Sequence, residues 1–305
     1  MAYTGTGTQN DPYVVDNWES LIEKIADAEA YVTVADNVDI DLTKIYPEGI
    51  SYTNAPPLLN FACKEFDGNG ITIRNAYSLS PRTGSNAVIE CATTCDALSN
   101  INFVNFYING GDVDPVLIRS RKSNNYITIA HCTFKGVLFT SHSSNIYFWR
   151  YINRFFDCVW NVKLVASYNS SYFYNTVVFD SCWLRFDTNI HWKDYGNGRF
   201  VNTYLEGNFA ASTNNTKILE LGNPLVSIIN ATLNAGEYTG CSVYTNSNAS
   251  LILINTDKFI GNIALTGYND TVKFIGVTDS QLKDENYLSP IFPVVPTKKE
   301  VVGNV

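Results

Sequence analysis

Short runs of alternating apolar and polar residues recur along the chain, and most of them end in the same kind of residue. Each run reads apolar, any residue, apolar, any residue, and then a small polar residue, most often Asn. The runs 101–105 (INFVN) and 226–230 (VSIIN) are two clear cases. Strict alternation of this kind is typical of a β-strand with one buried face, and not of a helix.

The third position of the run serves as a marker for the repeat. It is occupied by Ile73, Phe103, Ile129, Phe155, Phe179, Phe200, Ile228, Leu253 and Phe274. Successive markers are between 21 residues (179 to 200) and 30 residues (73 to 103) apart. A repeat of this length indicates a solenoid, and the leucine scaffold and helical half of a leucine-rich repeat are missing. We therefore predict a parallel β-helix in which the markers form one vertical column.

The fifth position of the run predicts the corners of the coils. It is occupied by Asn75, Asn105, His131, Asp157, Ser181, Asn202, Asn230, Asn255 and Gly276. These residue types favour turns because they tolerate a left-handed backbone and bond to nearby main chain. Stacked at the strand spacing of about 4.8 Å, identical amides can hydrogen-bond along the axis. We predict a structural ladder of amides at five of these positions: Asn75, Asn105, Asn202, Asn230 and Asn255.

The two ends of the chain depart from the repeat. Apolar residues from Trp18 to Ile25 recur at helical spacing after Asp16 or Asn17, which are suitable N-caps, and predict a short helix at about 17–29. Such a helix can cover the open first coil. Three prolines after position 289 predict an extended tail, because Pro interrupts strand pairing. The expected segments are therefore a lead-in with a capping helix (1–30), a parallel β-helix (31–280) and a Pro-containing tail (281–305).

Two motifs carry a resemblance to a known family. The opening GTGTQNDPYVV (5–15), followed by a short helix, and the later FDGNGITI (66–73) resemble the N-terminal half of pectin-lyase-like β-helix proteins. That superfamily includes pectate lyases, polygalacturonases, and the tailspikes and other appendages of bacteriophages. The resemblance covers about residues 3–280. It implies an all-β fold, a single-stranded right-handed parallel β-helix of about nine to ten coils, but not one activity, because the fold hosts many.

Composition and charge exclude several partners. The formal net charge is −8, and the only short basic run is Arg119–Lys122 (RSRK). A nucleic-acid partner is not expected, because phosphate binding needs a basic face. No apolar run approaches the length that spans a membrane, and residues 1–5 (MAYTG) do not open a signal peptide. We expect synthesis in the cytoplasm of a bacterial host and incorporation into a virion.

The seven cysteines are interpreted as buried free thiols rather than as a disulfide framework or a metal site. Cys132, Cys158 and Cys182 occupy one position of the repeat, where interior Cys behaves as a small apolar residue. Cys91 and Cys95 have no second pair at ligand spacing, so the zinc signal is weak. We expect no metal and no cofactor.

The catalytic constellations of the enzymatic relatives are incomplete in this chain. The polygalacturonase pattern begins with Asn-Thr-Asp, present here at 255–257, but the later Asp-Asp and Gly-His are missing. Few acidic residues align as calcium ligands of the pectate-lyase kind. Asp112 and Asp114 beside Arg119 are a remaining candidate for an acid site, and the loop His191–Tyr195 is a candidate for catalysis or sugar contact. We assign no catalytic residue.

Aromatic density in the middle of the chain predicts a binding surface. One face of each strand must point outward, and exposed Tyr and Trp suit sugar rings or another protein surface. The predicted binding residues are Trp149, Tyr151, Tyr172, Tyr174, His191 and Trp192.

Three functions remain open at this point. The favoured one is a non-catalytic phage tail-spike or fibre-like protein that forms a rod and binds a host-surface glycan or neighbouring virion proteins. The second is a depolymerase, a lyase or hydrolase that acts on a bacterial surface polysaccharide. The third is a purely architectural head or tail module. The resemblance to tailspikes also implies side-by-side homotrimers.

Overall fold

A computed structural model gives the fold of the chain as two compact units, Met1–Tyr168 and Asn169–Val305. It describes residues 3–49, 57–78, 87–111, 116–122, 127–141, 147–152, 154–166, 170–173, 177–188, 191–194, 199–209, 217–221, 225–229, 232–234, 241–245, 250–254, 263–265, 272–275, 278–288 and 299–302. We call Met1–Tyr168 unit 1 and Asn169–Val305 unit 2, and describe each by itself.

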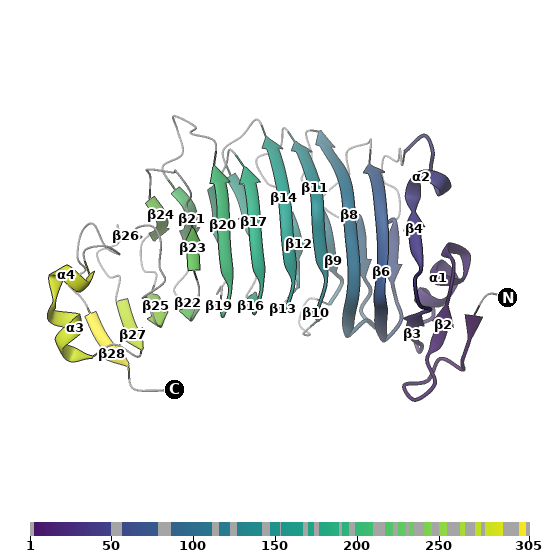
Figure 1. Ribbon diagram of the computed structural model, residues 1–305, viewed down its shortest axis with the longest axis horizontal. Coiled ribbons are helices and arrows are strands. Elements are labelled where there is room, and N and C mark those ends of the chain that lie inside the picture. The colour runs from purple at the N-terminus through teal and green to yellow at the C-terminus, as the bar shows by residue number, and fades with distance from the viewer. Residues whose placement is uncertain are drawn as a thin grey trace. The chain divides into compact units, whose positions relative to one another are not determined.

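Unit 1 is built mostly from β-strands, with two short helices near its N-terminus (Figure 1). In chain order its elements are β1 (Tyr3–Thr4), β2 (Tyr13–Val15), α1 (Trp18–Ile25), β3 (Tyr31–Val34), β4 (Asp39–Asp41), α2 (Leu42–Ile45), β5 (Leu59–Phe61), β6 (Glu65–Ser78), β7 (Ile89–Cys91), β8 (Ala97–Gly111), β9 (Val116–Ser120), β10 (Thr128–Ala130), β11 (Thr133–Ser141), β12 (Tyr147–Arg150), β13 (Arg154–Phe156) and β14 (Val159–Ala166).

These strands stack in parallel from coil to coil, as a β-solenoid requires. Strands β6, β8, β11 and β14 lie side by side in that order (Figure 1). A separate sheet contains β5, β7, β9 and β12, also in parallel. Only β1 and β2 pair in antiparallel fashion, among the described strand pairs. The predicted β-solenoid is confirmed for this part of the chain.

The register of these strands corrects one detail of the predicted repeat. Phe103 pairs with Phe134 and not with Ile129, because Ile129 pairs with Leu98, five residues earlier on β8. The two straight segments on either side of a corner carry the same apolar alternation, so the sequence pattern fits both. The predicted single column of markers is therefore wrong between positions 103 and 129.

Aromatic side chains stack along the interior of unit 1. The register brings Ile73, Phe103, Phe134 and Trp160 into one column. The rings of Phe103 and Phe134 stack at 5.1 Å, and those of Phe134 and Trp160 at 4.0 Å. All four side chains are completely buried. Offset aromatic stacking of this kind adds to the free energy gained by burial alone.

Helix α1 confirms the predicted N-terminal helix, although it ends earlier, at Ile25 rather than at about residue 29. Asn17 caps it: the Asn17 side chain accepts a hydrogen bond from the Ser20 amide at 2.9 Å, and Ser20 Oγ accepts from the Asn17 amide. Reciprocal bonds of this type satisfy two amides that the first helical turn leaves unpaired. Leu21 and Ile25 are buried, so the apolar face of the helix contributes to the core.

Unit 2 repeats the parallel stacking. Its elements are β15 (Ser170–Phe173), β16 (Val178–Asp180), β17 (Trp183–Thr188), β18 (His191–Asp194), β19 (Arg199–Val201), β20 (Tyr204–Phe209), β21 (Lys217–Leu221), β22 (Leu225–Ile229), β23 (Thr232–Asn234), β24 (Cys241–Thr245), β25 (Ser250–Ile254), β26 (Ile263–Leu265), β27 (Val272–Ile275), α3 (Asp279–Lys283), α4 (Glu285–Leu288) and β28 (Lys299–Val302). Here the predicted markers do pair in sequence, in the order Phe179, Phe200, Ile228, Leu253, Phe274.

The predicted tail, residues 281–305, is described at 281–288, where it is helical rather than extended, and at 299–302, where it forms a strand. It contains most of α3, all of α4, and β28, which pairs in parallel with β27 so that Val301 lies beside Phe274. Thr278 caps α3 by accepting a hydrogen bond from the Gln281 amide. The prolines at 290, 293 and 296 lie outside the described residues, and the strand forms after them. None of the described helices is long and apolar enough to span a membrane.

Candidate functional site

Residues with a left-handed backbone mark the corners between the straight segments of the coils. Positive φ angles occur at Asn37 (63°), Asn69 (49°), Asn75 (62°), Asn100 (55°), Asn105 (56°), His131 (52°), Tyr151 (60°), Asp157 (47°), Ser181 (58°) and Asn202 (47°). Asn and Asp adopt this region at lower cost than most residues, because their short polar side chains can bond locally. The list includes every described residue of the predicted fifth position. The predicted ladder residues Asn230 and Asn255 lie outside the described residues.

Unit 1 has two columns of corners rather than the single predicted ladder. Asn75 and Asn105 belong to one column, together with Gly136, whose φ is +67°. His131 and Asp157 belong to the other, because Ala130 pairs with Phe156 immediately before them. Asn202 is in unit 2, where it follows Val201 and stands beside Ser181. The prediction that Asn105 and His131 share a column is therefore wrong, for the same reason as the marker register.

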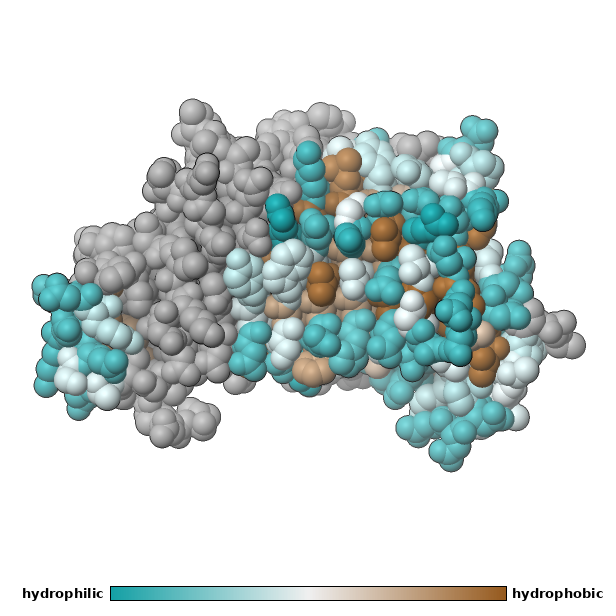
Figure 2. Space-filling view, in the orientation of Figure 1, coloured by the Kyte–Doolittle hydropathy of each residue, from teal (hydrophilic) through white to brown (hydrophobic). Residues whose placement is uncertain are grey.

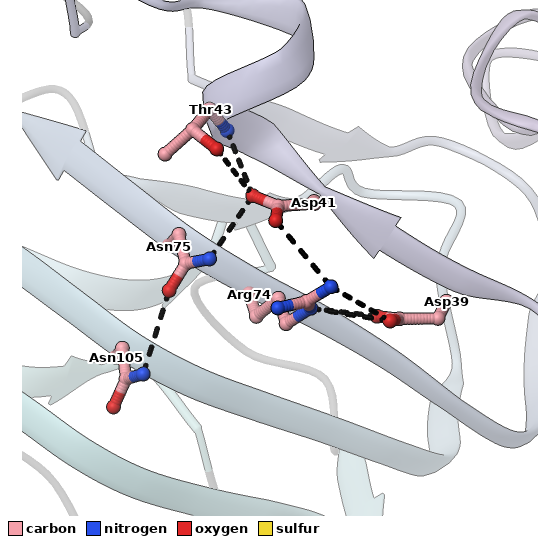
Figure 3. A network of polar contacts seen from close by, with 6 residues as sticks. All are labelled: Asp39, Asp41, Thr43, Arg74, Asn75 and Asn105. Carbon is pink, nitrogen blue, oxygen red and sulfur yellow. Dashed lines mark hydrogen bonds and ion pairs between the residues drawn. The ribbon is translucent and has the colours of Figure 1, made fainter.

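The first column carries a chain of polar contacts that ends at a helix (Figure 3). Asn105 Nδ2 donates to Asn75 Oδ1 at 3.4 Å, and Asn75 Nδ2 donates to Asp41 Oδ1 at 3.0 Å. The same Asp41 oxygen accepts from the Thr43 amide at 3.1 Å and from Thr43 Oγ1 at 2.7 Å. Asp41 is thus the N-cap of α2 and the terminal acceptor of the amide chain.

Arg74 adds a positive charge to this network. Its Nε donates to the two carboxylate oxygens of Asp39 at 3.0 and 3.2 Å, and its Nη2 lies 3.4 Å from Asp41 Oδ2. Hydrogen bonds from Thr43 and Asn75, with the Arg74 charge nearby, lower the pKa of Asp41 to about 2. Asp41 is therefore charged at neutral pH and acts as a hydrogen-bond acceptor rather than as a proton donor.

The second column of corners has its own links between coils. Asn69 Nδ2 donates to Asp36 Oδ1 at 2.9 Å, and Asn100 Nδ2 donates to Asp67 Oδ1 at 2.8 Å. Farther along, His131 Nδ1 lies 2.8 Å from Asp157 Oδ2. These groups are exposed, and each pair joins one coil to the next. The arrangement connects coils through side chains, in addition to the hydrogen bonds of the strands.

Small buried side chains follow the corners of the second column. The thiol of Cys132 donates to the Ala130 carbonyl at 3.2 Å, and that of Cys158 to the Phe156 carbonyl at 3.3 Å. Burial raises the pKa of Cys132 to about 12. In unit 2, Cys182 makes the equivalent contact with Asp180, and Thr203 with Val201. These three thiols are buried and free, as predicted. Each donates to the main-chain carbonyl two residues earlier, across the corner residue.

Cys63, Cys91 and Cys95 are also buried and free. Burial is the main cause that raises the pKa of Cys63 and Cys91 well above that of an ordinary thiol. Within the described ranges, no group of three or more His, Cys, Asp or Glu side chains is arranged to hold a metal ion. With 0% of each side chain exposed, these three thiols pack as small apolar groups.

One buried carboxylate was not singled out by the sequence. Glu90, on β7, is only 4% exposed, and its Oε1 accepts from Arg121 Nε at 2.6 Å. Its Oε2 has no hydrogen-bond partner among the described residues. Arg119, on β9, stands directly beside it in the sheet. The only sequence signal is a single charged residue within the apolar run 87–91 (AVIEC).

The predicted binding residues are divided between the two units. Trp149 lies on β12 beside Ile118 of β9, and Tyr151 follows that strand, half-buried. His191 and Trp192 lie on a strand, β18, and not in the loop that we predicted; Trp192 pairs with Ser171. The strand pairing also places Tyr172 beside Lys193. Tyr174 lies outside the described residues, as do the acid-site candidates Asp112 and Asp114.

Comparisons with models of protein families, with curated proteins and with solved structures gave no match for this chain.

Proposed function

We propose that this protein is a non-catalytic structural protein of a bacteriophage virion, a spike-like or fibre-like appendage that forms a rigid rod. The observation that carries the proposal is the use of polar groups at the corners of unit 1. Asp41 and Asp67 accept hydrogen bonds from amides of the next coil, and His131 contacts Asp157 across coils. Charges that are fixed in this way stiffen a solenoid, whereas a catalytic carboxylate must exchange protons or bind substrate.

The proposal extends the solenoid to the whole chain, as a right-handed helix of about nine to ten coils. Right-handed crossovers between parallel strands are the general rule. Helix α1 packs against β2, β3 and β5 with Leu21 and Ile25 buried, which suits a cap for the first coil. A cap is needed because an open solenoid end exposes both core and unpaired strand edges.

The same proposal gives the rod a recognition role toward a bacterial surface polysaccharide or neighbouring virion proteins. The aromatic residues Trp149, Tyr151, Tyr172, Tyr174 and Trp192, together with His191, are the proposed contacts. An aromatic face with a polar edge suits a sugar ring or a protein surface. The phage assignment itself rests on the two N-terminal motifs that resemble tailspike proteins.

A glycan array probed with the intact chain, followed by mass spectrometry of any glycan that binds, tests this function. We expect binding to at least one bacterial surface glycan, with no change in glycan mass. Trp149→Ala and Trp192→Ala should weaken that binding while leaving the circular dichroism spectrum unchanged. Shortened or unsaturated products would overturn the non-catalytic assignment in favour of a depolymerase. Unchanged binding by both variants would exclude the proposed aromatic contacts.

A further inference from the structure

Strand β6 turns a corner at residues 67–70 (DGNG), in a unit whose described surface is mostly hydrophilic in the view of Figure 2. The register with β8 is interrupted before Ile71, and three residues of β6 there lie opposite the single residue Asn100. Asn69 has a left-handed backbone with a φ of 49°, and Gly70 has a φ of 79°. Both residues are exposed, so water reaches this corner directly.

The residue that follows Asn69 sets it apart from the other corner asparagines. Asparagine is thermolabile because its side-chain amide can be lost, and the main-chain nitrogen of the next residue is the attacking group. A glycine at that place leaves the approach open, because it has no side chain. Among the described asparagines with a left-handed backbone, only Asn69 precedes a glycine; the others precede Val38, Ala76, Ile101, Phe106 and Thr203.

Two further Asn-Gly pairs occur in the sequence, at Asn109 and Asn197. Asn109 is half-buried on β8, where it pairs with Thr140 of β11. Asn197 lies outside the described residues. Asn69 is therefore the exposed Asn-Gly pair within the described ranges.

Space around Gly70 allows its nitrogen to reach the Asn69 side chain. In the described part of the chain, no atom beyond the adjoining residues lies within 4 Å of the position that a Cβ on Gly70 would take. The neighbouring pair Asp67–Gly68 could in principle form the same ring. However, Gly68 is buried, and a Cβ there would lie 2.5 Å from the Asn100 carbonyl oxygen. Packing thus holds the main chain at Gly68 and leaves room for movement at Gly70.

We propose that Asn69 is a site of spontaneous deamidation. The main-chain nitrogen of Gly70 loses its proton and attacks Asn69 Cγ, which forms a new C–N bond and closes a succinimide ring. The bond from Cγ to Nδ2 breaks, and Nδ2 leaves as ammonia after taking up a proton. Water then opens the ring at either carbonyl and gives aspartate or its isomer isoaspartate, in which the main chain runs through the former side chain. Overall, water is consumed and ammonia is released.

The product would reverse the sign of a link between two coils. In the intact chain, Asn69 Nδ2 donates to the Val34 carbonyl at 3.1 Å and to Asp36 Oδ1 at 2.9 Å. A carboxylate can donate neither bond, and its charge would stand against that of Asp36. The Asp67 carboxylate is in the same corner, where it accepts from the Asn69 amide at 2.9 Å. Deamidation therefore replaces an attraction between coils by a repulsion.

The test ages the intact chain at mildly alkaline pH and then digests it with trypsin in mildly acidic buffer, where the reaction is slow. Cleavage after Lys64 and Arg74 releases peptide 65–74, in which Asn69 is the only Asn or Gln. Mass spectrometry measures the conversion of amide to acid, and labelling by isoaspartyl methyltransferase identifies isoaspartate. Peptide 75–82, which contains Asn75 from the same strand, is the internal reference.

We expect peptide 65–74 to be converted progressively, with isoaspartate among the products, while peptide 75–82 stays unchanged over the same time. Gly70→Ala should suppress the conversion, and its methyl group fits the open space. Conversion that continues in Gly70→Ala, or that is equal at Asn75, would show that the following residue does not select the site. Conversion of a synthetic peptide 65–74 but not of the intact chain would show that the fold protects Asn69, and would overturn the proposal.

Two variants test the effect on the link between coils. Asn69→Asp should make hydrogen exchange over residues 31–37 faster than in the parent chain. Asn69→Asp/Asp36→Asn exchanges donor and acceptor, so it should return the exchange toward that of the parent. An Asn69→Asp chain with unchanged exchange, or a double variant with no recovery, would contradict the proposed repulsion.

Discussion

Asp41 shows how one side chain can join three parts of the structure. Its carboxylate accepts from the first turn of α2, from Asn75 on β6, and from Arg74. Each donor favours the charged form, so the pKa falls to about 2 in the folded chain. Protonation of this one carboxylate would therefore weaken its contacts with Thr43, Asn75 and Arg74 together.

The pH dependence of stability follows from that shift. The ordinary pKa of the Asp41 carboxyl is 3.8, and folding lowers it, so the unfolded chain binds more protons between these values. The contribution of Asp41 is fully present above pH 3.8 and is lost as the pH falls toward about 2. We expect thermal melts of Asp41→Asn to fall less steeply over that window than melts of the parent chain. Glu48→Gln, which removes an exposed carboxylate, should follow the parent curve; an Asp41→Asn curve parallel to the parent would contradict the linkage.

Gly136 tests the geometry of the first corner column. A Cβ atom there would lie 2.6 Å from Asn105 Oδ1, and the φ of +67° already disfavours other residues. Gly136→Ala should lower the free energy of unfolding by about 1–2 kcal/mol, measured in urea. Gly70→Ala is the matched control, because Gly70 has a φ of +79° but open space around its Cα. A loss at Gly70 as large as that at Gly136 would show that the contact with Asn105 contributes nothing.

At the scale of the element, a lysine fixes the N-terminal strand to the first helix. Lys24 Nζ lies 3.8 Å from the centre of the Tyr3 ring and 4.5 Å from that of Tyr13. A hydrogen bond to Tyr3 raises the pKa of Lys24, which keeps the ammonium charged between the two rings. Tyr3 and Tyr13 also contact each other edge to face at 5.4 Å. The pairing of β1 with β2 thus depends on a residue of α1.

Lys24→Met should therefore loosen β1 and β2 without unfolding unit 1. Met keeps the length of the side chain and removes the charge. The loss of the cation–π contacts should lower the free energy of local opening of this segment by about 1–2 kcal/mol. Hydrogen exchange measured by mass spectrometry should become faster over residues 3–15. Lys64→Met, which removes an exposed ion pair with Glu29, should leave the exchange of that segment unchanged. Faster exchange throughout unit 1 would instead indicate that Lys24 supports the whole core.

The interior aromatic column makes a second prediction for the elements. Phe134 lies on β11 between the rings of Phe103 and Trp160. Phe134→Ala would leave a cavity in a stack that has no exposed side, and should lower the free energy of unfolding by about 3–5 kcal/mol. Lys135→Ala, one residue along the same strand but pointing outward, should change it by less than about 0.5 kcal/mol. Similar losses for both variants would contradict the assigned faces of β11.

The strand alternation and the corner residues were predictable because they depend on local chemistry. A left-handed backbone favours Asn, Asp and Gly, and the sequence repeat has such residues at Asn75, Asn105 and Asp157. The register was not predictable, because Phe103 and Leu98 on the same strand carry equivalent apolar patterns on either side of a corner. Only contacts between coils determine the register, in which Ile129 pairs with Leu98 and not with Phe103.

The contents of the site were predictable to a smaller extent. Glu90 was missed because a single charged residue in an apolar run carries no pattern. His191 and Trp192 were placed in a loop because the run that contains them mixes charge with aromatic residues, yet strand pairing with β15 and β21 holds them in β18. The end of the chain was misjudged for a related reason: prolines mark where a strand is interrupted, and not whether the chain returns to form another one.

At the scale of the whole molecule, the proposed homotrimer can be tested directly. One chain has a mass of 34.0 kDa, so a trimer has three times that mass. We expect the trimer mass in light scattering at micromolar concentration, because resemblance to tailspikes implies side-by-side association. The measurement should be repeated at high salt, because salt screens the repulsion between chains that each carry a net charge of −8. A monomer mass under both conditions would count against the trimer and leave the fold unaffected.

The buried thiols can report how often individual coils open, because they react only when exposed. Cys132 and Cys158 lie on adjacent coils of unit 1 and Cys182 lies in unit 2, each sealed beneath a corner by a contact with a main-chain carbonyl. A reagent such as iodoacetamide can reach each sulfur only when that coil separates from its neighbours, because the thiol must be both exposed and deprotonated to react. Peptide mapping of the alkylated cysteines over time would therefore rank the coils by how often each one comes apart, with no label added to the protein.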